Sequence, residues 1–128
     1  MGQQFLIDSN IIIDFLGSKI PASKSQLINS IINNVPAVSV ISKIEVLGFN
    51  APAEELKLLE DFFNDILILD LSEEVINQTI QLRRSLKIKT PDAIIAATAI
   101  AYQLTLVTRN TDDFKNIQGI VLVNPFEE

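Results

Sequence analysis

The sequence predicts an α/β fold: a three-layer α/β/α sandwich with a mainly parallel central sheet, formed by residues 1–128 as one domain. Short apolar runs alternate with helical stretches along the whole chain. That alternation is typical of parallel strands joined by helices that cover both faces of a sheet. With 128 residues, of which 48% are hydrophobic, the chain is long and apolar enough to form one buried core.

The first half of the chain holds two predicted strands and three predicted helices. An apolar run that ends in Asp8 has the length of a buried strand, and Pro36 sets off a second short run. Isoleucine and leucine recur at helical spacing between Ser25 and Asn33. In chain order, we expect a strand at 4–8, helices at 11–16 and 25–33, a strand at 37–41 and a helix at 42–49.

The second half continues the pattern after a break at residues 50–52. Ser72 is a suitable N-cap for one of its helices. The helix that starts at Pro91 consists mostly of alanine and isoleucine, so we expect it to be buried. In chain order, we expect a helix at 53–64, a strand at 66–71, helices at 72–86 and 91–103, and strands at 104–108 and 120–123.

The chain contains no cysteine and no histidine. The absence of histidine excludes Ser-His-Asp triads, Cys-His pairs and histidine-ligated zinc. The absence of cysteine excludes disulfides and thiolate metal sites. Any chemistry must therefore come from carboxylates, hydroxyls, amides, lysine, arginine or a bound ion.

No stretch of the sequence is long enough for a transmembrane helix. The most apolar one, 93–101, falls far short of the roughly 20 residues that a bilayer requires. Residues 1–4 lack the basic residues that open a signal peptide. We therefore expect no membrane association and a cytoplasmic location.

The net charge of −6 argues by itself against a nucleic-acid partner, because phosphate binding normally requires a basic surface. The charge is uneven, however, since half of the acidic residues lie between Glu54 and Glu74 and a basic cluster follows them. This cluster is either an exposed helix face or a set of phosphate contacts. It consists of Arg83, Arg84, Lys87 and Lys89.

Asp8 ends the first predicted strand, and Glu45 lies on the predicted helix that follows the second one. Ligands of open parallel sheets bind beyond the carboxyl ends of the strands, where these acids fall. Each acid also has an ordinary structural explanation. Asp8 suits an N-cap, and Ser42–Glu45 matches the capping box S-x-x-E. The sequence leaves both interpretations open.

Asp92 and Asp113 occupy similar positions later in the chain. Asp92 follows Thr90, a predicted N-cap, and Pro91, so it stands in a first helical turn where the helix dipole favours an acid. Asp113 follows the strand at 104–108, in a segment that also suits a solvated turn capped by Thr111. Taken alone, neither acid requires a function.

The arrangement of the four acids is more informative than any one of them. Strand ends and helix starts of a parallel sheet converge on one rim, and carboxylates about 4 Å apart repel by about 4 kcal/mol per pair at an effective dielectric of about 20. An all-oxygen site suits Mg²⁺ or Mn²⁺ as the neutralising cation. Such ions lower the pKa of bound water and stabilise charge on a phosphoryl group. The arrangement therefore predicts phosphodiester hydrolysis.

Four motifs resemble the PIN-domain family, and its VapC-type toxins in particular. Phe5–Asn10 (FLIDSN) resembles the opening strand with the first acid, and Ser42–Glu45 (SKIE) resembles the second acidic position. Thr90–Ala99 (TPDAIIAATA), the most specific of the four, is similar to the helix with the third acid. Leu106–Phe114 (LVTRNTDDF) resembles the closing motif. The resemblance covers nearly the whole chain in the family's order.

The resemblance implies an Mg²⁺- or Mn²⁺-dependent endoribonuclease that is the toxin of a toxin–antitoxin pair, with a small cognate antitoxin as inhibitor and a homodimer as a common assembly. Asp8 and Asp92 would be the principal metal ligands, and Glu45 would complete the site or orient the attacking water. Many relatives carry an acid where this chain has Asn110. Either Asp113 takes that fourth catalytic position, or the fourth ligand is weak.

Residues beside the acids take supporting roles in this interpretation. Ser9 and Asn10 are expected either to orient the metal ligands or to cap a helix. Arg109 joins the basic cluster as a candidate contact for RNA phosphates. The apolar segments 11–16 and 28–35 are candidate antitoxin surfaces, although ordinary core explains both of them better.

Two other functions stay open at this point. Asp8-Ser9-Asn10 faintly resembles the Asp-x-Asp loop of aspartyl phosphotransfer domains, but the second acid is missing and no lysine ends a late strand. The other alternative is a catalytically silent module that uses the PIN fold for partner binding. The acidic net charge and Asn110 allow this alternative, whereas the other acids argue against it.

Overall fold

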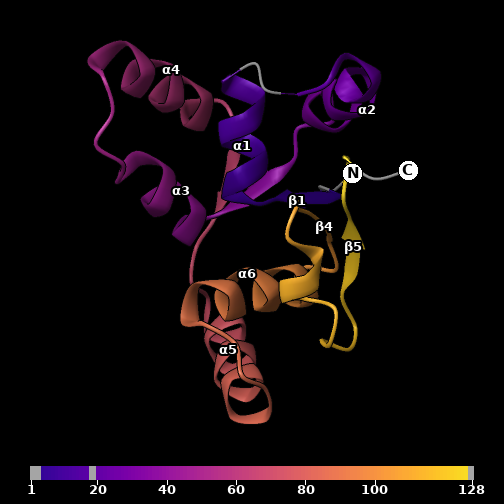
Figure 1. Ribbon diagram of the computed structural model, residues 1–128. Helices are drawn as coiled ribbons and strands as arrows, with labels where there is room; N and C mark the ends of the chain where they lie inside the picture. The colour runs from indigo at the N-terminus through magenta and orange to yellow at the C-terminus, as the bar shows by residue number, and fades with distance from the viewer. Residues whose placement is uncertain (1–3, 18–19, 127–128) are drawn as a thin grey trace.

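The centre of the fold is a five-stranded sheet in which every neighbouring pair of strands is parallel (Figure 1). The computed structural model describes residues 4–17 and 20–126. Three of the four residues on which the signal-peptide prediction rests, 1–3, therefore lie outside the described residues. The strand order is β3-β2-β1-β4-β5. The strands are β1 (Phe5–Ile7), β2 (Ala37–Ser39), β3 (Leu67–Leu69), β4 (Thr105–Val107) and β5 (Val121–Val123). The predicted parallel sheet is confirmed.

Helices cover both faces of this sheet (Figure 1). Leu6 and Leu106 pack into a core with α6, whereas the next residues, Ile7 and Val107, pack into a second core with α1 to α4. This alternation follows from the two-residue period of a strand. The first face carries α5 (Glu73–Ser85) and α6 (Thr90–Ala101), and the second carries α1 (Ser9–Leu16), α2 (Ala22–Asn33), α3 (Val40–Leu47) and α4 (Ala53–Asn64). The three-layer sandwich is confirmed.

The start of α3 differs from the prediction. Ser39 is its N-cap, and the Ser39 hydroxyl accepts a hydrogen bond from Ile41 N at 3.2 Å. The capping box predicted at Ser42–Glu45 is therefore wrong, because the helix has already begun when the chain reaches Ser42. The Ser42 side chain is instead buried inside the helix layer, and its hydroxyl has no hydrogen-bond partner among the described residues.

The start of α6 also differs by one residue. The Lys89 carbonyl accepts the first helical hydrogen bond, from Ala93 N at 2.9 Å, so Lys89 is the N-cap and the predicted cap Thr90 begins the helix. Ser72 does cap α5 as predicted, through a bond from Val75 N at 3.2 Å. Asp92 stays in the first turn of α6 in either assignment.

The helix α6 is buried, as its composition predicts. Six of its residues are buried, most of them alanines, whose small side chains allow close packing against α5 and the sheet. Their burial fixes the first turn of α6, with Asp92, at the edge of the sheet. Across residues 4–17 and 20–126, no helix combines the length and the apolar character needed to cross a membrane.

Candidate functional site

The four predicted acids come from four different elements. Asp8 follows β1 directly, Glu45 lies on α3, Asp92 lies in the first turn of α6, and Asp113 ends the short 3₁₀ helix η1 (Thr111–Asp113) after β4. In a parallel sheet with antiparallel crossover helices, strand ends and helix starts share one rim. We call these four residues the rim acids.

Asp8 is the most firmly held of the rim acids. Its side chain is 6% exposed, and its carboxylate accepts hydrogen bonds from Ser9 N at 2.8 Å, from the Thr108 hydroxyl at 2.8 Å and from Asn10 Nδ2 at 3.3 Å. Burial raises the pKa of Asp8 above its ordinary 3.8; the bonds from Thr108 and Ser9 lower it, and the charge of Asp113 raises it. Asp8 is also the N-cap of α1, so the structural role coexists with the site.

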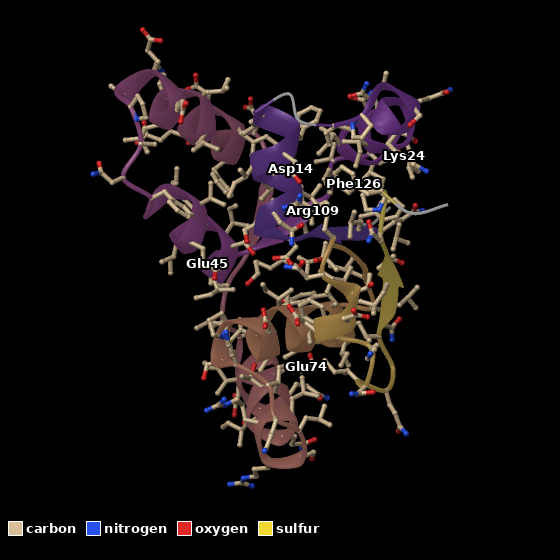
Figure 2. All side chains as sticks on the ribbon, viewed as in Figure 1. Asp14, Lys24, Glu45, Glu74, Arg109 and Phe126 are labelled. Atoms are coloured by element: carbon tan, nitrogen blue, oxygen red, sulfur yellow. The ribbon has the colours of Figure 1, made fainter. Side chains whose placement is uncertain are left out.

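Burial and the charges of neighbouring rim acids both raise the pKa values of Asp8, Glu45 and Asp92. Partial burial raises the pKa of Glu45 above 4.5, and the charges of Asp8 and Asp92 raise it further. Burial also raises the pKa of Asp92 above 3.8, and the charges of Asp113 and Asp8 add to it. Glu45 lies where α3 approaches α6 (Figure 2). The rim acids therefore form one cluster of mutually repelling carboxylates.

Thr108 ties this cluster to the sheet, and the sequence did not single it out. Its side chain is fully buried at the end of β4. Its hydroxyl donates to Asp8 Oδ2 at 2.8 Å and accepts from Asn10 Nδ2 at 3.2 Å and from Asn110 N at 3.1 Å. The sequence signal was a polar residue directly after an apolar strand, but its meaning depends on β4 lying beside β1.

The predicted neighbours Ser9, Asn10 and Asn110 all join this hydrogen-bond network. The Asn10 amide bridges the ends of β1 and β4, because its Nδ2 reaches both Asp8 and Thr108. Asn110 contributes its backbone amide and stands at the N-cap position of η1. In the structure, these residues orient the site through hydrogen bonds.

The chemistry of the donors suits a hard divalent cation. Within the described part of the chain, no three acidic side chains already form a metal-ligating group. All side-chain acceptors of the rim acids are nevertheless carboxylate oxygens, the donors that Mg²⁺ and Mn²⁺ prefer. Burial, and after it the charges of neighbouring acids, raises the pKa values of Asp8, Glu45 and Asp92, and a bound cation would offset those negative charges.

The four residues of the predicted basic cluster lie in different surroundings. Lys89, beside the first turn of α6, is exposed, and its charge lowers the pKa of Asp92, so it reaches the rim. Arg83 donates to the Ile88 carbonyl and thereby holds the loop between α5 and α6. Arg84 and Lys87 are exposed. Of the four, Lys89 is the one that the structure links electrostatically to the acids.

Arg109 is engaged with the protein itself. Its Nε lies 3.0 Å from Asp14 Oδ2, and its guanidinium carbon lies 5.7 Å from the centre of the Phe126 ring (Figure 2). Asp14 is only 5% exposed, and the sequence did not single it out. The Asp14 oxygen accepts no hydrogen bond of good geometry from any described residue, so the contact is an ion pair.

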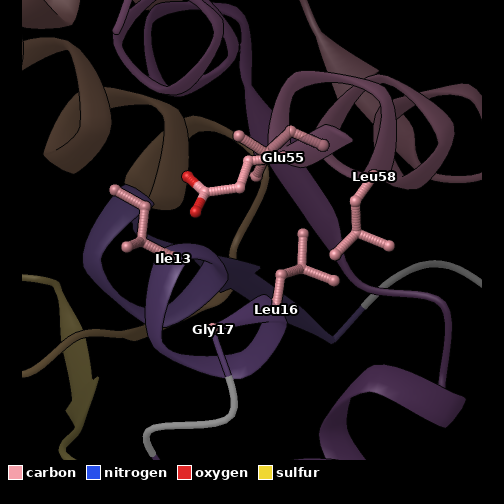
Figure 3. A pocket seen from close by; sticks show the side chains of 6 residues that line it. Ile13, Leu16, Gly17, Glu55 and Leu58 are labelled. Carbon is pink, nitrogen blue, oxygen red and sulfur yellow. The ribbon is translucent and has the colours of Figure 1, made fainter. Parts of the chain in front are cut away.

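A separate pocket of about 260 Å³ lies between α1 and α4 (Figure 3). None of the rim acids lines it. The candidate antitoxin segment 11–16 is largely core, as expected, but it also contributes to this pocket. In the second candidate segment, 28–35, Ile28 and Ile31 are buried, whereas most of the other residues, Val35 among them, are exposed. The walls of the pocket are formed by Ile13, Leu16, Gly17, Glu55, Leu58 and Leu59.

Known proteins resemble this chain along nearly its full length. A chain of a toxin–antitoxin complex from Klebsiella pneumoniae is 30% identical with a TM-score of 0.77, and the match covers 98% of this chain and 100% of that one. A chain of VapBC2 from Rickettsia felis, bound to a DNA fragment from its promoter, is 26% identical with a TM-score of 0.80, and the match covers 95% of this chain and 98% of that one. A chain of DNA-bound VapBC from Salmonella typhimurium is 25% identical with a TM-score of 0.83, and the match covers 97% of this chain and 99% of that one.

The family comparison agrees with these structural matches. No curated protein matches the sequence significantly. The PIN domain family, however, matches residues 5–120, which include all four rim acids. The chain therefore belongs to the PIN-domain family.

Proposed function

We propose that this PIN-domain chain is a metal-dependent endoribonuclease and the toxin of a toxin–antitoxin pair. The observation that carries the proposal is the clustering of the rim acids, in which burial and neighbouring charges raise the pKa of three carboxyl groups. Family membership supports a nuclease, and the toxin–antitoxin complexes among the similar structures support the biological role.

The proposed metal ligands are Asp8, Glu45 and Asp92, with Asp113 at the fourth position. An Mg²⁺ or Mn²⁺ ion bound there would offset charge on the scissile phosphate and acidify a water molecule. The chain sets the orientation of Asp8 in advance, because Thr108 and Ser9 hold its carboxylate by hydrogen bonds of 2.8 Å. Glu45 is exposed with a raised pKa, which suits a group that takes a proton from the attacking water.

The RNA backbone requires positive charge beside these acids. Lys89 provides it, because it is exposed and its charge already acts on Asp92. Arg84 and Lys87 extend this exposed charge along the same segment. We propose that Lys89 contacts the phosphate next to the cleaved bond, so that the substrate is held despite the net charge of −6.

The pocket between α1 and α4 is the proposed antitoxin site. Its walls are mostly aliphatic, with Glu55 among them, and Leu58 is 48% exposed. An amphipathic antitoxin segment with a basic residue opposite Glu55 fits this chemistry. We expect Leu58→Asp to weaken antitoxin binding at least about tenfold by calorimetry, as hot-spot substitutions do, without changing RNA cleavage by the free chain.

We also propose a cytoplasmic location, because the proposed substrate is RNA.

The family resemblance further suggests that the chain forms a homodimer, and light scattering of the purified chain tests this assembly. A dimer mass at micromolar concentration supports this assembly, and a monomer mass contradicts it.

The function is tested by Asp8→Asn and Asp92→Asn. Both substitutions remove a rim charge and keep the side-chain shape, so we expect RNA cleavage to be abolished while the circular dichroism spectrum is unchanged. Asp61→Asn is the matched control, because Asp61 is an exposed acid on α4 whose partner is Lys57. Full RNase activity in either rim variant would contradict the proposed mechanism.

A further inference from the structure

Asp14 is a buried carboxylate that has no part in the proposed mechanism. It lies in α1 beside the buried Ile11 and Ile12, and only 5% of its surface is exposed. A buried carboxylate is unfavourable unless a counter-charge faces it. Arg109 supplies that charge at 3.0 Å from the loop after β4, about a hundred positions further along the chain.

The backbone of Arg109 is fastened on both sides as well. Its amide donates to Asn10 Oδ1 at 3.2 Å, and its carbonyl accepts from Asn124 Nδ2 at 3.2 Å. Its guanidinium packs over the ring of Phe126. Arg109 therefore joins α1, the loop after β4 and the segment after β5 at a single point.

Two rim acids depend on the elements that meet there. Asn10 accepts a hydrogen bond from the Arg109 amide through its Oδ1, and its Nδ2 donates a hydrogen bond to Asp8 at 3.3 Å. The loop that starts at Arg109 continues into η1, where Asp113 N donates to Asn110 O at 3.0 Å. A shift of Arg109 would thus move both an Asp8 partner and the loop that carries Asp113.

We propose that Asp14 and Arg109 form a positioning pair, which fixes the loop after β4 against α1 and so sets the relative placement of Asp8 and Asp113. This inference rests on the proposed nuclease function for its activity readout. It assigns Arg109 a role other than the RNA contact expected from the sequence. The charge of Arg109 is already balanced by Asp14, which weakens its attraction for a phosphate.

The test is a double-mutant cycle with Asp14→Asn, Arg109→Gln and the two combined. We expect each single variant to lower kcat for RNA cleavage about 10- to 100-fold, the usual effect of losing a partner that orients a metal ligand, with KM within about twofold. The combined variant should be no worse than the poorer single one, because the two residues act as a unit. Arg109→Lys, which keeps the charge, should recover part of kcat.

The exposed pair of Lys115 and Asp112 provides the matched control in the same loop. Its Nζ–Oδ1 distance is 3.8 Å and both side chains are more than half exposed, so Lys115→Gln should leave kcat unchanged. A second readout is hydrogen exchange of the Arg109 and Asn110 amides, which bond to Asn10 and Thr108. We expect Asp14→Asn to speed exchange at these two amides while the β1 amides stay protected.

Two results would overturn the positioning pair. The first is a rise in KM with Arg109→Gln while Asp14→Asn keeps wild-type kinetics, which identifies Arg109 as an RNA contact. The second is unchanged amide exchange in Asp14→Asn. If the wild-type chain cleaves no RNA, the proposed function fails, and the exchange experiment still decides on the pair. If Arg109→Gln does not fold, Asp14→Asn and Arg109→Lys carry the comparison.

Discussion

Replacing Thr108 with valine removes the hydroxyl that holds the site together and leaves the side-chain shape nearly unchanged. Thr108 is fully buried, and its hydroxyl takes part in three hydrogen bonds: one to Asp8, one from Asn10 and one from the amide of Asn110. Because valine fills the same space, no cavity term contributes. The change in stability therefore reports on the hydrogen bonds.

The expected loss follows from these bonds. The bond to Asp8 is charge-assisted and is worth about 1.5–3 kcal/mol, and each neutral bond is worth about 1 kcal/mol. Asn10 and Asn110 are partly or fully exposed, so water replaces much of what they lose. We expect Thr108→Val to lower the free energy of unfolding by about 2–4 kcal/mol. The pKa of Asp8 should rise further, because the bond from Thr108 lowers it.

The assay is urea denaturation at neutral pH, with Thr98→Val as the control. Thr98 is 1% exposed, but among the described residues its hydroxyl bonds only to the Ile94 carbonyl of its own helix, at 2.7 Å, so its loss should cost about 1 kcal/mol or less. Equal losses in the two variants would refute the reasoning, since burial alone would then explain both.

Three further predictions follow from burial and charge. The pKa values of Asp8, Glu45 and Asp92 are raised, so the stability that their protonated forms contribute is complete below pH 3.8 and is lost as the pH rises through the raised values. Urea titrations across this pH range should show the free energy of unfolding falling, and added Mg²⁺ should restore it. Ser42→Ala removes a buried hydroxyl without a partner among the described residues and should raise the free energy of unfolding by up to about 1 kcal/mol in urea; a loss above that size would contradict this. Phe114→Ala empties a fully buried position and should cost about 3–5 kcal/mol, which thermal unfolding measures; an unchanged midpoint would contradict the packing.

The fold was predictable because hydrophobic periodicity reports directly on burial. The strand at Phe5–Ile7 is an apolar run because its side chains enter two different cores, as Leu6 and Ile7 do. Element ends were less predictable. The capping box at Ser42–Glu45 was a valid local pattern, but Ser39 offered its hydroxyl to the helix three residues earlier. Two serines were therefore possible N-caps of the same helix, and the local sequence does not show which of them caps it.

The positions of the rim acids could be predicted, whereas the contacts that hold them could not. Asp8 and Asp113 come after strands and Asp92 starts a helix, and these places lie on one side of a parallel sheet. Glu45 lies further into its helix than the sequence indicated, because α3 begins at Val40. The bond from Thr108 to Asp8 spans a hundred positions and requires that β4 lies beside β1. The same adjacency brings Arg109 to Asp14. Strand order was the missing information.

The central claim is that the rim acids bind one hard divalent cation together. Calorimetric titration of the folded chain with Mn²⁺ tests it most directly, with Asp92→Asn beside the wild type and Asp61→Asn as control. We predict that wild type and control bind Mn²⁺ alike, and that Asp92→Asn weakens binding at least about tenfold. Equal Mn²⁺ affinity in all three proteins, or no binding by the wild type, would contradict the account.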